Sequence, residues 1–210
     1  MKNLSRLGRL WRRSALRRLG LASGGSVAIE AALLLPLGLF AGIGAWELYS
    51  YYRAVSVVDR AAFMIANSVA MQRQLVDGGD CDLSDHICTY GALAPDLLQP
   101  LGYREGGGLV ISLFATQTLA DDATPAWEEQ QRWQRAYQGS ANLARLASRL
   151  DPPSGFPQAS TGDTMVVVEV FYDYRPFSMS TAFWQSLGGE RTIASRVFQR
   201  PRFTSLQALQ

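Results

Sequence analysis

The sequence lacks most of the residue patterns on which enzymes depend. Its 210 residues include one histidine and two cysteines, and they contain no Gly-x-Ser-x-Gly, His-Glu-x-x-His or phosphate-loop pattern. A single histidine limits general acid–base chemistry, and the motifs of common hydrolases are missing. Catalysis by carboxylates stays open, but the composition favours a protein that is not an enzyme and that needs no cofactor.

Acidic residues are missing from the first 25 positions, which carry seven basic side chains. These are Lys2, Arg6, Arg9, Arg12, Arg13, Arg17 and Arg18. Basic residues that precede an apolar span stay on the cytoplasmic side of a membrane, so the chain beyond the span is expected to face outward. The whole chain has a net charge of +2, and removal of residues 1–25 would leave 2 − 7 = −5. The remaining domain therefore has no basic excess that would favour nucleic acid, whereas the basic segment suits anionic lipid.

Between Ser26 and Trp46 the sequence has no ionisable side chain except Glu30. As a helix, these 21 residues would measure about 31 Å at about 1.5 Å per residue, enough to cross the lipid bilayer once. Aromatic residues typical of a membrane interface follow the span: Trp46, Tyr49, Tyr51 and Tyr52. A carboxylate inside such a span is costly, so Glu30 indicates a functional role.

A secretory signal peptide has the same order of basic and apolar segments. The signal peptidase requires small residues after the apolar core of its substrate. In this chain residues 45–49, which follow the apolar core, are mostly bulky. The small residues Gly24, Gly25 and Ser26 lie before the core. This order disfavours a signal peptide.

The span contains one proline and several glycines. Pro36 removes one backbone donor, and Gly38, Gly42 and Gly44 add little bulk, which predicts a kinked or loosened helix. The Gly38-x-x-x-Gly42 pattern also permits close approach of another helix.

Apolar residues continue beyond the span at alternating spacings of three and four, and they share one helical face. They are Leu48, Tyr51, Val55, Val58, Ala62, Ile65 and Val69. We expect this face to pack against the chain's own soluble domain; a coiled-coil seam is the alternative, but the pattern lasts only about three heptads. The helix is expected to extend to residue 76, before Gly78 and Gly79.

Cys81 and Cys88 are the two cysteines, and they flank a short polar segment. An even pair at close spacing in an oxidising compartment predicts one local disulfide. Segment 80–86 also offers three aspartates and His86 as metal ligands, but it lacks the glycine and glutamate of a calcium-binding EF-hand loop. We therefore predict no metal site and interpret His86 as a solvated loop residue.

From Gly106 onward the periodicity becomes strand-like. The sequence predicts strands at 109–114, 131–137, 165–174 and 192–198, a short helix at 141–150, and turns at 121–125 and 188–189. Within the third strand Val166, Val168 and Val170 share one face, and Glu169 and Asp173 share the other.

These patterns predict an α+β fold, in which a long N-terminal transmembrane helix extends into the periplasm and precedes a small antiparallel sheet of about four strands. The expected segments are a basic leader at 1–25, a transmembrane helix at 26–50, a periplasmic helix extension at 51–76 and an α+β domain at 77–210. No internal repeat is evident.

The sequence from Gly24 to Glu30 resembles the processing site of type IV prepilins, with a glycine before the cut and a glutamate as the fifth mature residue. More specifically, the chain resembles the TadE/TadF-type pseudopilins, which are minor pilins of the tight-adherence (Tad/Flp, type IVc) pilus. The N-terminal resemblance covers about residues 20–60. A looser C-terminal resemblance involves Trp133-Gln134-Arg135, Tyr137, Gly139, the strand that ends in Arg175-Pro176, and Arg200.

This resemblance implies cleavage between Gly25 and Ser26 by a prepilin peptidase. It also implies that Tad pilus inner-membrane assembly proteins and other major and minor pilins are partners. The expected location is the bacterial inner membrane, as a single-pass protein with a cytoplasmic N-terminus and a periplasmic C-terminal domain, and the pilus surface after assembly. The major pilin of that system is much shorter than this chain, which favours a minor subunit.

Cleavage would create an α-amino group at Ser26, and Glu30 of a neighbouring subunit would pair with it. A head-to-tail contact of this kind can build an open helical filament. The alternative for Glu30 is that its side chain only reaches the lipid headgroups. Two alternatives for the whole chain also stay open: an uncleaved single-pass anchor of a periplasmic binding domain, and a minor pseudopilin of type II secretion.

Overall fold

The computed structural model describes residues 24–118, 124–139, 155–176, 185–186, 192–203, 206 and 209. The helix expected at 141–150, the turn expected at 188–189 and part of the turn expected at 121–125 lie outside these residues. The chain divides into two units, Met1–Leu48 and Tyr49–Gln210.

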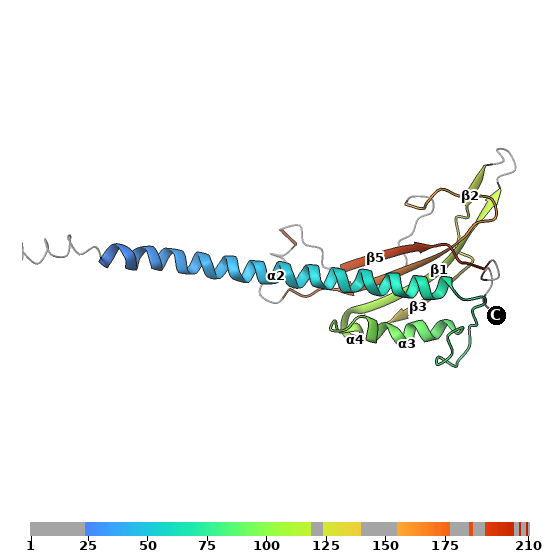
Figure 1. Cartoon of the computed structure of the whole chain (residues 1–210), viewed down its shortest axis with the longest axis horizontal. Coiled ribbons are helices and arrows are strands. Elements are labelled where there is room, and N and C mark those ends of the chain that lie inside the picture. Colours follow the sequence, from blue (N-terminus) through green and yellow to red (C-terminus); the bar gives the residue numbers. More distant parts are fainter. Residues whose placement is uncertain are drawn as a thin grey trace, which may run out of the picture. The chain divides into compact units, whose positions relative to one another are not determined.

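The first unit contains the beginning of α2, a helix that spans Gly24–Ala70 and continues through Pro36 (Figure 1). Within the described part of the chain, it is the helix long and apolar enough to cross a membrane. Its apolar side chains are exposed on every side: Ile29, Leu33, Leu34, Leu35, Leu37, Leu39 and Phe40. A helix that is apolar all round, with no protein covering it, suits a lipid environment.

In the second unit α2 becomes amphipathic, as the spacing predicted. Val58, Ala62, Ile65 and Val69 are buried in the core of this unit, and Tyr51 packs against that core. The interpretation that this face packs on the chain's own domain is therefore confirmed. Leu48, which was expected on the same face, is instead 49% exposed.

α2 ends at Ala70, whereas the sequence pattern predicted helix up to residue 76. The amides of Met71 and Gln72 turn back to carbonyls of the last helical turn. Leu75 and Val76 then pair as isolated bridges with Leu209 and His86. These extended backbone contacts replace the helical hydrogen bonds that residues 71–76 would otherwise make.

Two short helices precede the sheet: α3 at Ile87–Leu97 and α4 at Tyr103–Gly106. The sequence analysis did not predict either of them. The five strands are β1 Gly107–Thr118, β2 Pro125–Trp127, β3 Trp133–Gln138, β4 Thr164–Asp173 and β5 Thr192–Gln199. The predicted class, α+β with a long apolar helix before a small antiparallel sheet, is confirmed.

The sheet is antiparallel, with the order β2-β1-β4-β5 and β3 also paired to β1. Leu109, Ile111 and Leu113 of β1 lie opposite Val170, Val168 and Val166 of β4. These six side chains belong to the same core cluster as the buried face of α2 and parts of α3.

The opposite face of the sheet is also buried in its centre, which the sequence did not predict. Met165, Val167 and Phe171 of β4 are at most 3% exposed. Glu169 lies among them with 2% exposure. Arg196 on the neighbouring strand donates from Nε to its Oε1 at 3.1 Å, and the Nη2 of Arg196 lies 3.0 Å from the same oxygen. An ion pair reduces the cost of burying the carboxylate.

Candidate functional site

The predicted processing residues lie at the start of α2. Gly25 and Ser26 belong to its first turn, and Glu30 follows in the next turn with an exposed side chain. Positions 26 and 30 are four residues apart in a helix, so they lie on the same side and about 6 Å apart along its axis. The structure thus places positions 26 and 30 on one face of α2.

Gly38 and Gly42 are four residues apart, so they lie on one face of α2. A Cβ atom built at Gly38 or Gly42 would have no neighbouring side chain or other segment within 4 Å, and the same holds for Gly44 on the other side of the helix. The surface of a single chain therefore offers room for the backbone of another helix.

Cys81 and Cys88 form a disulfide with a Cα–Cα distance of 5.2 Å, as the sequence predicted. The loop that it closes lies between α2 and α3. Backbone hydrogen bonds secure the base of this loop: the Val76 amide donates to Asp85 at 2.8 Å, and the Ile87 amide donates to Val76 at 3.0 Å.

His86 is not the fully solvated residue that the sequence suggested. It precedes the first residue of α3 and is half-buried, with its ring against Gly78, where a Cβ atom would lie 2.8 Å from Cε1. Within the described residues no three His, Cys, Asp or Glu side chains converge as metal ligands.

The residues that carry the C-terminal resemblance have structural roles. Trp133 donates from its indole Nε1 to the Leu206 carbonyl at 3.0 Å, which ties β3 to the end of the chain. Arg135 forms an ion pair with Asp77, and its hydrogen bond lowers the pKa of that carboxyl group. Arg200 forms a 3.0 Å ion pair with Asp163.

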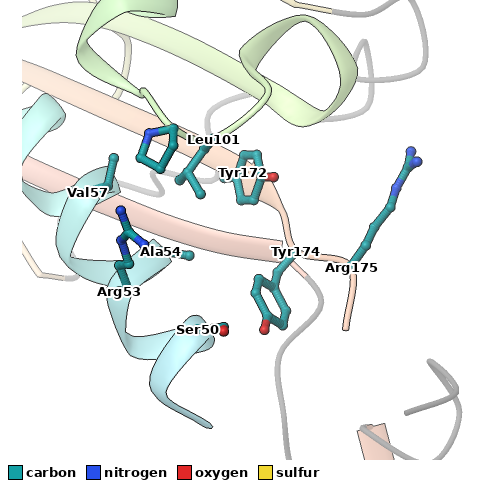
Figure 2. Close-up of a pocket in the computed structure, with 9 residues that line it drawn as sticks. Ser50, Arg53, Ala54, Val57, Leu101, Tyr172, Tyr174 and Arg175 are labelled. Atoms are coloured by element: carbon teal, nitrogen blue, oxygen red, sulfur yellow. The ribbon is translucent and has the colours of Figure 1, made fainter. Parts of the chain in front are cut away.

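The second unit also contains a pocket that sequence reasoning missed. It has a volume of about 240 Å³, and Figure 2 shows its lining. Ser50 and Arg53 of α2 are part of its lining. Tyr172, Tyr174 and Arg175, around the end of β4, also line it. The one sign of this pocket in the sequence was the presence of Arg53 and Arg175. Because these arginines lie far apart in the chain, the sequence did not suggest that they share a site.

No protein-family model, curated protein or solved structure matches this chain. The assignment of function therefore depends on the residues and geometry of the chain itself.

Proposed function

We propose that this chain is a minor pilin or pseudopilin of a Tad/Flp-type adhesive pilus, cut by a prepilin peptidase between Gly25 and Ser26. The observation that carries the proposal is Glu30, which is the one carboxylate between Ser26 and Trp46 and follows the glycine pair directly before the span by five residues. The chain acts by assembly with other pilins, and it performs no catalysis.

The chemistry of Glu30 follows from its position. A carboxylate in hydrocarbon is costly unless a cation lies beside it. Cleavage after Gly25 supplies such a cation, because it creates an α-amino group at Ser26. When the carboxylate of one subunit meets the amino group of the next, two costly charges become one pair and the axial register between subunits is set.

The exposed apolar side chains of α2 support the same proposal. Outside the apolar span, the helix buries one face in its own domain and leaves large apolar side chains on the other. Tyr52, Phe63 and Met64 are 61%, 57% and 45% exposed. Exposed apolar side chains on a helix are points at which neighbouring subunits of a filament can pack.

In this proposal the chain is inserted in the bacterial inner membrane before assembly. Residues 1–25 stay in the cytoplasm, and the domain after Tyr49 lies in the periplasm until it enters a pilus. The basic leader supports this orientation by the positive-inside rule, and the Cys81–Cys88 disulfide suits an oxidising compartment.

The test compares Glu30→Ala and Glu30→Leu with the wild type in the native cell. Both variants should insert and be cut normally, because the span becomes more apolar, but piliation or surface adherence should fall. Leu33→Ala is the matched control, since Leu33 is an exposed residue in the same part of α2. Normal piliation in both Glu30 variants would contradict the assembly role of this carboxylate.

N-terminal sequencing of the protein from its native membrane tests the processing step separately. A mature chain that begins at Ser26 is expected. A chain that retains residues 1–25 would identify an uncleaved single-pass anchor instead.

A further inference from the structure

We propose that the pocket between α2 and the end of β4 binds the phosphate of an anionic phospholipid headgroup at the outer surface of the membrane. The inference requires that α2 crosses the bilayer, but it does not require that the chain forms a pilus.

The first argument is the position of the pocket along the chain. Ser50 and Arg53 follow Trp46, the last residue of the apolar span, by four and seven residues in one continuous helix. They therefore lie about 6 and 10 Å beyond it along the helix axis. The headgroup layer on each side of the hydrocarbon is about 5–8 Å thick. A long arginine side chain can reach back across such a distance.

The second argument is charge. Figure 2 shows Arg53 and Arg175 on opposite sides of the two tyrosine rings, with the Arg175 side chain extended away from the rings, and both arginines are exposed. Neither guanidinium belongs to a salt bridge with the described residues, in contrast to Arg135, Arg196 and Arg200. Guanidinium groups bind phosphate through paired hydrogen bonds.

The third argument is the lining between the arginines. Burial raises the pKa of Tyr172; a hydrogen bond with the Gly102 backbone and the charge of Arg175 lower it, and the carboxylates of Glu105 and Asp173 raise it, with a net rise. The hydroxyl therefore keeps its proton and can donate to an anion. Ser50 adds a second hydroxyl at the other side of the pocket. Ala54, Val57 and Leu101 are the apolar part of the lining, which suits the glycerol and upper acyl region of a lipid.

The size of the pocket agrees with a headgroup. Its volume of about 240 Å³ lies below the range of about 300–1,000 Å³ that is typical of sites for larger small molecules. A phosphate with its glycerol fits a pocket of this small size.

The experiment uses the full chain in nanodiscs of phosphatidylcholine that contain a minor fraction of phosphatidylglycerol. The protein is extracted in mild detergent, and the two retained lipids are quantified by mass spectrometry. We expect the wild type to retain phosphatidylglycerol above its fraction in the disc. The double variant Arg53→Gln/Arg175→Gln should lower this enrichment about fivefold for each arginine removed.

Arg60→Gln is the matched control. Arg60 is exposed and lies seven residues after Arg53, on nearly the same face of α2, but it does not line the pocket. Its variant should keep the enrichment. A cooperative thermal unfolding transition like that of the wild type reports that each variant is folded.

Four results would overturn the proposal. The first is an unchanged enrichment in the double variant. The second is an equal loss in Arg60→Gln, which would mean general surface charge and no pocket. The third is release of phosphatidylglycerol by excess inorganic phosphate, which would mean that the site takes a free anion. Failure of the chain to enter nanodiscs would also overturn it, whereas failure of piliation in Glu30 variants would leave it untouched.

Discussion

Gly139 lies directly against the backbone of Tyr103, so that a Cβ atom on Gly139 would overlap the Tyr103 carbonyl oxygen. The Gly139 amide donates to the Gly107 carbonyl at 3.0 Å. The Tyr103 hydroxyl donates to the Tyr137 carbonyl at 2.8 Å. These contacts hold the end of β3 against α4 and the start of β1.

Replacement of Gly139 by alanine should destabilise the domain by about 1–3 kcal/mol, because the new methyl group meets backbone that cannot rotate away. Denaturant unfolding of the variant measures this effect. Gly79→Ala is the control, since a Cβ atom there has nothing within 4 Å. Equal stability of the two variants would contradict the packing described here.

The stability of the domain should fall at alkaline pH because of buried tyrosines. Burial raises the pKa of Tyr103 to about 12, above the value of about 10 in an unfolded chain. A raised tyrosine pKa means that the folded state holds the proton more tightly. Its contribution to stability is therefore complete below about pH 10 and is lost as the pH rises through about 12.

The same sign holds for Tyr90, Tyr137 and Tyr172, whose pKa values are raised chiefly by burial. The free energy of unfolding, measured against pH, should fall over this window, and Tyr103→Phe should reduce the slope. Spectrophotometric titration of the phenolates gives an independent check. Titration of every tyrosine near pH 10 in the folded protein would contradict this prediction.

Removal of the disulfide should destabilise the domain by about 2–3 kcal/mol, because the bond restricts a loop of about eight residues in the unfolded chain. The double variant Cys81→Ser/Cys88→Ser, compared with the wild type by thermal unfolding, measures this loss. Alkylation before and after reduction reports the bond itself. Free thiols before reduction, in protein purified from the native membrane, would show that the bond does not form in the cell.

Gly25→Leu should leave a full-length precursor, because the peptidase must accept a backbone with almost no side chain before the cut. Immunoblotting measures the ratio of precursor to mature protein. Gly20→Leu, at another glycine of the basic leader, should be processed normally. A Gly25→Leu protein of mature size would contradict the proposed processing site.

The sequence by itself determined the elements that depend on local periodicity and composition. The apolar span, the buried face of α2 around Val58 and Ile65, and the alternating strand β4 follow from patterns within a few residues. The disulfide also followed from the sequence, because Cys81 and Cys88 were the only pair and lay close together.

Only the tertiary structure decided the features that depend on distant segments. The end of α2 at Ala70 depends on pairing of residues 75–76 with His86 and Leu209. The burial of Glu169 depends on Arg196, which β5 brings beside it. The pocket exists because α2 and the end of β4 place Arg53 and Arg175 around the same space. Local periodicity carries no information on such pairings, because they are set by strand register and by the packing of the helix on the sheet.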